Sequence, residues 1–267
     1  MIVADWVDDG LRDALTAAGL DTVAGAWAYA GGADLDKPGL GRRRRTRLEL
    51  TDASGRRHQL YLKRYGREAV SARLRRAWTH GFGRGPARVE YENVVAARAA
   101  GVPTMRPVAC GERDGCGCLL VTAVPGDALE RCGAGFLAQH ADAAQHVTAA
   151  LATLVRALHG GGYVHRDLYA SHVFLDVSQG NVALYLIDLA RMFRPRWRRR
   201  RWVVKDLAAL RYSMPAEWVG GQWEAFVAAY AREMSAARRR ALATAVGRKA
   251  RSIARHAARR AAREQGE

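Results

Sequence analysis

Alternating apolar and polar residues predict a β-rich first part of the chain. Residues 46–50 and 59–65 alternate in this way, and the sequence Asp-Ala-Ser-Gly at 52–55 is typical of a turn between them. Residues 105–109 and 118–123 have the composition of two further short strands. We therefore expect four strands before residue 125.

Helical spacing of apolar residues appears next. Residues 87–100 are expected to form a helix that ends at Gly101, with Pro103 just beyond it. After residue 125, apolar residues recur every three or four positions up to a glycine run at 160–162. These residues are Val147, Leu151, Leu154, Val155 and Leu158. Short strands are expected at 173–175 and 183–187, and helices from about 204 and from 222 to the end.

Pro125 and Gly126 separate the two patterns. We expect an α+β protein with two lobes and a cleft between them. Residues 1–124 would form a β-rich N-terminal lobe with one helix, and residues 125–267 a helical C-terminal lobe.

Composition narrows the class of protein. The 267 residues carry a formal net charge of +17, and 49% of them are hydrophobic, which is too many for a disordered chain. No apolar run approaches the roughly 18 residues of a membrane-spanning helix, and the acidic N-terminus does not resemble a signal peptide. Neither an integral membrane protein nor a secreted protein is expected. The four cysteines fit no paired zinc-binding pattern, so idle thiols are the default interpretation.

The most informative stretch is 163–176, YVHRDLYASHVFLD, followed by 184–193, LYLIDLARMF. His165-Arg166-Asp167 lies between a predicted helix and a predicted strand, and Asp188 ends the next strand. This order is typical of a kinase catalytic loop and its metal-binding aspartate. Phosphoryl transfer needs a base at the attacking hydroxyl and anionic ligands for Mg²⁺. The sequence predicts Asp167 for the first role and Asp188 for the second.

Lysine is rare in this chain, where arginine supplies nearly all the cations. The lysines are Lys37, Lys63, Lys205 and Lys249. Lys63 ends an alternating strand, where its flexible ammonium group would contact the phosphates of ATP. Its expected partner is Glu90, which shares a helical face with Val94 and Ala97. Glu92 lies about 200° away around that helix and is the weaker candidate.

Three motifs taken together resemble a known family. HRD-x-x-x-x-H, IDL-x-R and the segment WVVKDLAALRYS at 202–213 are similar to the Kdo/WaaP family of lipopolysaccharide kinases. The resemblance covers about residues 40–215. It implies a bilobal protein-kinase-like fold, with a small β-rich N-lobe that binds nucleotide and a larger α-helical C-lobe. It also implies ATP-dependent phosphorylation of a heptose or 3-deoxy-manno-octulosonic acid (Kdo) in the lipopolysaccharide inner core.

His172 departs from ordinary protein kinases, which place an asparagine at this position to bind a second metal. The resemblance implies that histidine is usual in this family. Because imidazole is a poor ligand for Mg²⁺, one magnesium ion, or a water-mediated contact from His172, is expected.

The resemblance suggests roles for further residues. Asp206 would anchor the backbone of the catalytic loop, and His165 would hydrogen-bond within that loop beside Arg166. Arg191 would either meet a substrate phosphate or carboxylate or remain a solvated cation. Gly39 and Gly41 lie where a phosphate-binding loop belongs, although two glycines are a weak signal.

Arginine-rich segments at 42–45, 195–201 and 236–265 allow several interpretations: solvated faces, a nucleic-acid patch, or contacts with an anionic glycolipid and an anionic membrane surface. The family resemblance favours the last of these and makes nucleic acid the weakest. For the C-terminal segment, a helix on lipid head groups and a solvated helix covering the second lobe remain equally open.

The expected function is transfer of the γ-phosphate of ATP, with Mg²⁺, to a sugar hydroxyl of an anionic glycolipid or core oligosaccharide. The expected location is the cytoplasm or the cytoplasmic face of the inner membrane. Two alternatives stay open: a kinase of the same fold acting on protein or another small molecule, and a basic, non-catalytic adaptor that keeps the fold.

Overall fold

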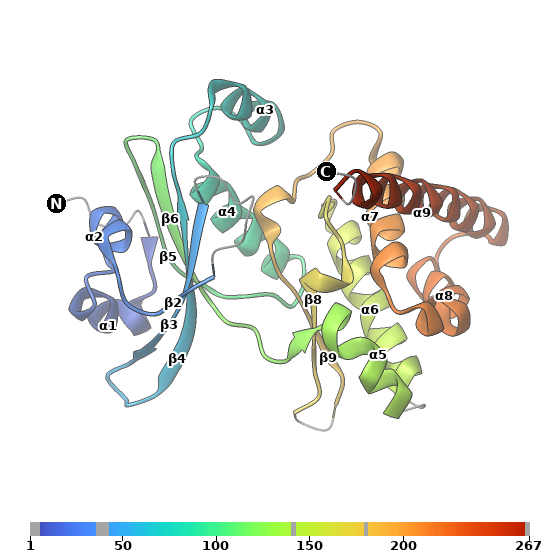
Figure 1. The fold of residues 1–267 in the computed structure, drawn as a ribbon, viewed down its shortest axis with the longest axis horizontal. Coiled ribbons are helices and arrows are strands. Elements are labelled where there is room, and N and C mark those ends of the chain that lie inside the picture. The colour runs from blue at the N-terminus through green and yellow to red at the C-terminus, as the bar shows by residue number, and fades with distance from the viewer. Residues whose placement is uncertain (1–5, 36–42, 140–142, 179–180, 265–267) are drawn as a thin grey trace. The chain divides into compact units, whose positions relative to one another are not determined.

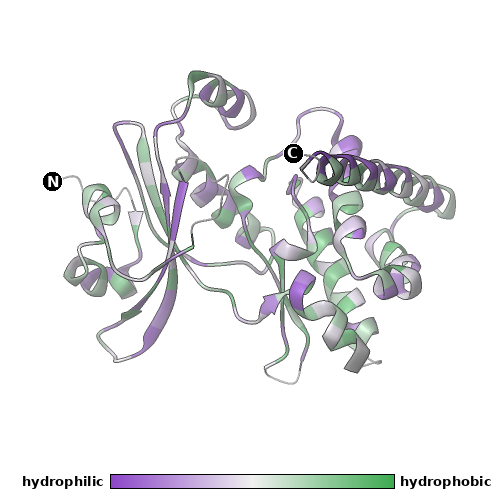
Figure 2. Ribbon diagram, viewed as in Figure 1, coloured by the Kyte–Doolittle hydropathy of each residue, from purple (hydrophilic) through white to green (hydrophobic). Residues whose placement is uncertain are grey.

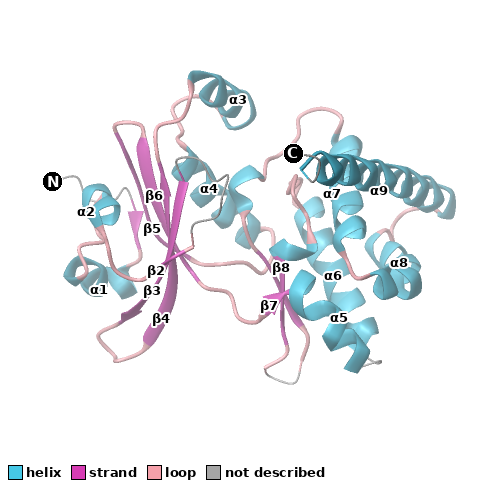
Figure 3. Cartoon of the chain, in the orientation of Figure 1, coloured by secondary structure: helices cyan, strands magenta, loops and turns pink. Residues whose placement is uncertain are grey.

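A computed structural model describes residues 6–35, 43–139, 143–178 and 181–264. The chain divides into two compact units, one made of Met1–Arg98 and Thr104–Val124, the other of Ala99–Pro103 and Pro125–Glu267 (Figure 1). The first unit is built on a β-sheet and the second is mainly helical, so the predicted α+β class is confirmed (Figure 3).

The first unit contains an antiparallel sheet of six strands in the order β1-β5-β6-β4-β3-β2. Its long central strands are β3 (Arg43–Thr51), β4 (Arg57–Tyr65), β5 (Pro107–Arg113) and β6 (Cys116–Thr122), which contain or overlap the four predicted strands. The edges are the short strands β1 (Trp6–Val7) and β2 (Ala33–Asp34). The β3–β4 hairpin turns at 52–56, where the carboxylate of Asp52 accepts hydrogen bonds from the backbone N–H groups of Ser54 and Arg56.

Helices cover both faces of this sheet. On one face, α1 (Arg12–Ala17) and α2 (Val23–Ala28) enclose an apolar core with Leu60 and Leu62 of β4. On the other face lies α4 (Pro86–Ala99), which matches the predicted helix. A further helix, α3 (Val70–His80), follows β4 and has no buried residue.

Strand β4 carries adjacent buried cations on opposite faces, because successive side chains of a strand alternate. Lys63 points toward α4. Arg64 points toward the end of α2, where its guanidinium donates to the carbonyl oxygens of Trp27 and Tyr29 at 3.4 and 3.0 Å.

The second unit is organised around α6 (Ala143–Gly160), whose predicted apolar stripe is buried. Beside it lies the small antiparallel sheet of β7 (Asp127–Ala128), β8 (Val173–Asp176) and β9 (Ala183–Leu186). The remaining helices are α5 (Leu129–Gln139), α7 (Arg199–Ser213), α8 (Ala216–Tyr230) and α9 (Ala236–Glu264). Figure 2 shows hydrophobic residues gathered along α6 and a mixture of hydrophobic and hydrophilic ones along α9.

The helical region predicted from residue 222 to the end consists of two helices, the first of which, α8, begins earlier, at Ala216. The region breaks at 231–235, between α8 and α9. Leu242 and Val246 of α9 are buried where this helix packs on α7, so its first part covers the second unit. Within the described ranges, no helix has both the length and the apolar character needed to cross a membrane.

Candidate active site

Lys63 and Glu90 form a buried ion pair within the first unit. The Lys63 ammonium donates to one oxygen of the Glu90 carboxylate, and the hydroxyl of Tyr65 donates to the other. The carboxylate therefore has a partner on each oxygen, as a buried charge requires. The predicted pairing is confirmed, whereas the role of Lys63 in binding ATP stays a prediction.

Glu92 takes a different place, as its helical phase predicts. It lies at the surface, where its carboxylate pairs with Arg84 and Arg88 at 3.2 Å each. Gly39 and Gly41 lie outside the described residues, so the proposed phosphate-binding loop stays a prediction.

In the second unit, Asp206 of α7 holds the backbone of the loop that follows α6. Its two carboxylate oxygens accept hydrogen bonds from the backbone N–H groups of His165 and Arg166, at 2.6 and 2.8 Å. The Nε2 atom of His159 on α6 lies 3.3 Å from the same carboxylate. Asp206 is fully buried, so these donors replace the water that its charge would otherwise need. This is the anchoring contact that the family resemblance implied.

His165 ties the same loop to the strand that precedes Asp188. Its Nε2–H donates to the carbonyl oxygen of Ile187 at 3.0 Å. Burial lowers the pKa of His165, because a desolvated imidazolium is unfavourable. Burial therefore favours the neutral form of the ring. The guanidinium of Arg166 packs over the rings of Phe193 and Trp202, 5.6 and 5.5 Å from their centroids.

Asp167 projects from this loop and is paired with a guanidinium. The Nη1 atom of Arg191 lies 2.9 and 2.8 Å from the two carboxylate oxygens. Arg191 belongs to the 3₁₀ turn Leu189–Arg191 that follows Asp188. About half of the Arg191 side chain (49%) is exposed, so both roles expected for Arg191 stay predictions, and its contact with Asp167 is a further feature that was not expected.

His172 connects Asp167 to Asp188. A carbonyl oxygen can only accept, so the His172 Nδ1–H donates to the carbonyl oxygen of Asp167, at 2.8 Å. This leaves His172 Nε2 facing the Asp188 carboxylate at 3.7 Å. Arg166, just before Asp167, has φ 74°, and Asp188 itself has φ 58°. Positive φ values are unusual for residues other than glycine. The loop is thus built to bring these side chains together at the cost of local strain.

The residues fit a magnesium ion that is bound mainly by its nucleotide. Among the described residues, no three His, Cys, Asp or Glu side chains are grouped closely enough to form a metal site by themselves. Magnesium usually takes one or two protein carboxylates and completes its shell with phosphates and water. Asp188 would supply such a carboxylate, whereas the nitrogen of His172 would be a poor ligand for Mg²⁺.

Lys205 and Tyr65 also contact residues named above, and neither contact was expected from the sequence pattern. Lys205 lies 5.8 Å from the ring of Trp202. Partial burial lowers the pKa of its ammonium group, while the charge of Asp167 acts in the opposite direction. The rarity of lysine was the available signal for Lys205. The contact of Tyr65 with Glu90 needed the register of β4 against α4, which the sequence does not give.

Comparison with known families agrees with this geometry. The model of the lipopolysaccharide kinase (Kdo/WaaP) family matches residues 40–230, which includes Lys63, Glu90, the catalytic loop, Asp188 and Asp206. Comparison with curated proteins gave no match. The match spans most of the chain, and this protein belongs to the lipopolysaccharide kinase (Kdo/WaaP) family.

Proposed function

We propose that the protein transfers the γ-phosphate of ATP to a sugar hydroxyl, on heptose or Kdo, of the lipopolysaccharide inner core or a similar anionic glycolipid. Family membership makes it a kinase, and therefore a phosphotransferase. The observation that carries the residue assignment is the contact pattern of His172, whose ring lies between the Asp167 backbone and the Asp188 carboxylate.

In the proposed reaction, Asp167 accepts the proton of the acceptor hydroxyl. The acceptor oxygen then forms a bond to the γ-phosphorus, the bond between that phosphorus and the β–γ bridging oxygen breaks, and ADP leaves. Lys63 binds the α- and β-phosphates, and Glu90 holds Lys63 in position. Asp188 would hold Mg²⁺, which when bound neutralises phosphate charge.

Arg191 and His172 lie beside the carboxylates of Asp167 and Asp188. The Arg191 guanidinium orients the Asp167 carboxylate until the acceptor arrives. The Nδ1–H group of His172 holds the backbone carbonyl of Asp167, and Nε2 lies 3.7 Å from the Asp188 carboxylate, too far for a hydrogen bond. Lys205 adds positive charge on the Asp167 side, where the transferred phosphoryl group is negative.

The test is transfer of label from γ-labelled ATP, with Mg²⁺, into a glycolipid extract. We compare the wild type with Asp167→Asn and with a matched control, Asp176→Asn. Asp176 ends β8 and bonds to the backbone of Ser178 at 2.9 Å, away from the proposed base. Label in the glycolipid with the wild type and the control, and none with Asp167→Asn, is the expected result. Full activity of Asp167→Asn would refute the assignment of the base.

The substrate is tested in the same assay. Acceptors that carry Kdo alone, or Kdo with heptose, distinguish the two sugars, and mass spectrometry locates the phosphate. Label in protein or in a soluble small molecule would favour the first alternative, a kinase with another acceptor. No label anywhere, with the protein folded by circular dichroism, would favour the non-catalytic adaptor.

A further inference from the structure

Helix α3 exposes an apolar stripe to solvent. Val70, Leu74 and Trp78 recur every four residues along it, and Phe82 follows just beyond its end. Their exposed fractions are 68, 60, 79 and 84%. Elsewhere in the described part of the chain, large apolar side chains are exposed only singly along the sequence. A contiguous exposed stripe is unusual for a surface without a binding partner.

Basic residues border this stripe on both sides. Arg73 and Arg75 lie about 100° to either side of Leu74 around the helix axis, and both are exposed. The helix contains no acidic residue. An apolar stripe between arginines, with a tryptophan near one end, is the pattern of a helix that lies in the interface of an anionic membrane.

The helix is attached to its unit by polar contacts. Arg76 forms an ion pair with Glu68, and its Nε donates to the carbonyl oxygen of Arg84 at 2.7 Å. The loop after α3 is held by Glu112, which accepts from the backbone N–H of Gly85 at 2.8 Å. Because these contacts place the helix without covering its apolar side chains, the stripe remains available to a partner.

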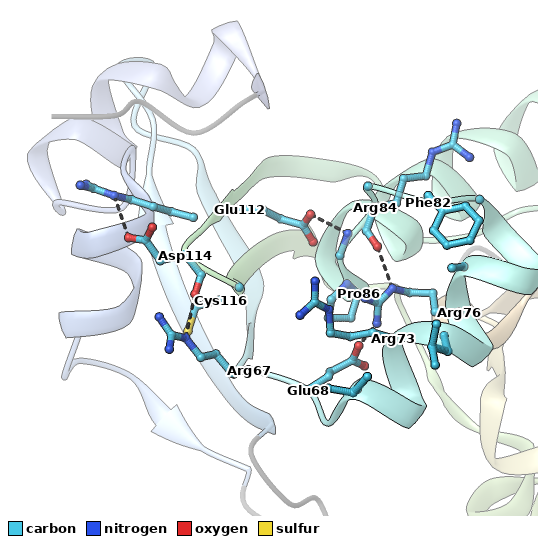
Figure 4. A pocket seen from close by; sticks show the side chains of 18 residues that line it. Arg67, Glu68, Arg73, Arg76, Phe82, Arg84, Pro86, Glu112, Asp114 and Cys116 are labelled. Atoms are coloured by element: carbon cyan, nitrogen blue, oxygen red, sulfur yellow. Dashed lines mark hydrogen bonds and ion pairs between the residues drawn. The ribbon is translucent and has the colours of Figure 1, made fainter.

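An open cavity of about 730 Å³ adjoins the helix, lined by Val70, Leu74 and Phe82 of the stripe, by the glycine-rich loop and by the turn between β5 and β6. Figure 4 shows Arg73, Arg76 and Arg84 around this cavity together with the acidic residues Glu68, Glu112 and Asp114, and Phe82 near its edge. Arg76 is paired with Glu68 and Arg84 with Glu92, so the contacts with lipid phosphates are assigned to the exposed Arg73 and Arg75.

We propose that α3 and the loop at 81–85 form a membrane-docking surface. Val70, Leu74, Trp78 and Phe82 enter the boundary between head groups and acyl chains of an anionic phospholipid bilayer, and Arg73 and Arg75 contact lipid phosphates. The choice of a bilayer as the occupant rests on the charge of this surface and on the proposed function, in which the acceptor is attached to lipid. Docking would hold the enzyme on the surface where that acceptor lies.

The experiment is vesicle flotation without ATP or acceptor, so its result does not depend on the kinase assignment. Vesicles of phosphatidylcholine alone are compared with vesicles that also contain phosphatidylglycerol. The wild type should bind the anionic vesicles preferentially. Leu74→Ser/Trp78→Ser should weaken that binding at least about tenfold, because two large apolar side chains no longer enter the lipid. Arg73→Gln/Arg75→Gln should remove most of the preference for anionic lipid.

Two matched variants separate this surface from others. Val95→Ser changes an apolar residue of α4 that is 43% exposed, and Trp197→Ser changes a tryptophan that is 71% exposed in the arginine-rich segment 195–201. Both should keep most of the vesicle binding. Unchanged binding by Leu74→Ser/Trp78→Ser, or loss with Trp197→Ser alone, would overturn the proposal. These side chains are exposed, so the thermal unfolding midpoint of each variant should stay near that of the wild type, which controls for folding.

Two further results would replace the bilayer by another occupant. If the wild type forms a dimer that Leu74→Ser/Trp78→Ser converts to monomer, with vesicle binding unchanged, the stripe is an interface between copies. If soluble phosphate displaces the protein from vesicles and Leu74→Ser/Trp78→Ser does not, the site binds free anions instead. With a delipidated, soluble acceptor, Leu74→Ser/Trp78→Ser should keep wild-type kinase activity. With the acceptor in vesicles, the same variant should lose activity about tenfold.

Discussion

Arg191 binds both carboxylate oxygens of Asp167 through one nitrogen, Nη1, at 2.9 and 2.8 Å. In the proposed mechanism, the acceptor hydroxyl must reach the same carboxylate. The guanidinium therefore orients the carboxylate before the acceptor binds. When the acceptor hydroxyl binds, it replaces one or both of the contacts with Arg191.

Replacing Arg191 tests this relationship. Arg191→Met should lower kcat about tenfold to a hundredfold, because a misoriented base reacts poorly, and should change the KM for ATP little. Steady-state kinetics with varied acceptor and ATP measure the two effects. Arg232→Met, at an exposed arginine 3.8 Å from Glu233, is the control and should be inert. A wild-type kcat in Arg191→Met would show that the contact has no catalytic role.

The buried ion pair between Lys63 and Glu90 predicts that removing one charge destabilises the protein more than removing both. Glu90→Gln leaves the Lys63 ammonium buried beside a neutral amide, and should lower the free energy of unfolding by about 3–5 kcal/mol. Lys63→Met/Glu90→Leu removes both charges and should cost less. Urea unfolding measures both values. A double variant that is less stable than Glu90→Gln would contradict this account. Both proteins should lose ATP binding, which a thermal-shift titration with ATP and Mg²⁺ checks.

Asp206→Asn should release the catalytic loop. An asparagine amide has one oxygen, so one of the backbone N–H groups of His165 and Arg166 would face an NH₂ donor. The loss of one buried hydrogen bond should cost about 1–3 kcal/mol in unfolding free energy. Hydrogen exchange of these two amides should accelerate more than exchange in β4, and activity should fall. Equal acceleration in both places would indicate global destabilisation instead.

Asp52 gives a pH dependence of stability. Hydrogen bonds from the Ser54 side chain and His58, followed by backbone N–H groups, hold the pKa of Asp52 well below its ordinary value of 3.8. A carboxylate with a depressed folded-state pKa contributes stability above its unfolded pKa, and this contribution is lost as the pH falls below 3.8 toward the folded value. The difference in unfolding midpoint between the wild type and Asp52→Asn should therefore shrink from pH 5 to pH 2. A difference independent of pH would exclude this cause.

Periodicity predicted the elements that bury a regular face. The helices at 86–99 and 143–160 carry apolar stripes with buried residues, and their ends are marked by glycine. Helix α3 was missed because its apolar residues occur once per turn among arginines and contribute nothing to the core. The break between α8 and α9 was missed because the segment 231–235 contains neither glycine nor proline. Helix α8 begins directly after Pro215, and a proline before a helix is a start signal that can be recognised in the sequence.

Contacts in the site also differ in whether the sequence pattern could predict them. The pairing of Lys63 with Glu90 was predictable because the kinase pattern requires a lysine and a glutamate on the next helix, and helix periodicity then favours Glu90 over Glu92. The contact of Arg191 with Asp167 was not, because it depends on the left-handed backbone of Asp188, which redirects the chain into a 3₁₀ turn. The role of Asp206 came from the family resemblance, since a buried aspartate inside a helix has no pattern of its own.

The opposed cations of β4 have a consequence for strand pairing. A slip of one residue in β4 would exchange Lys63 and Arg64 between the two faces of the sheet. Glu90 would then meet a guanidinium too large for its buried site, and the carbonyl oxygens of Trp27 and Tyr29 would lose their donors. Apolar neighbours tolerate some misalignment, but buried charges without partners do not. The two cations therefore favour the observed register of β4 over registers shifted by one residue.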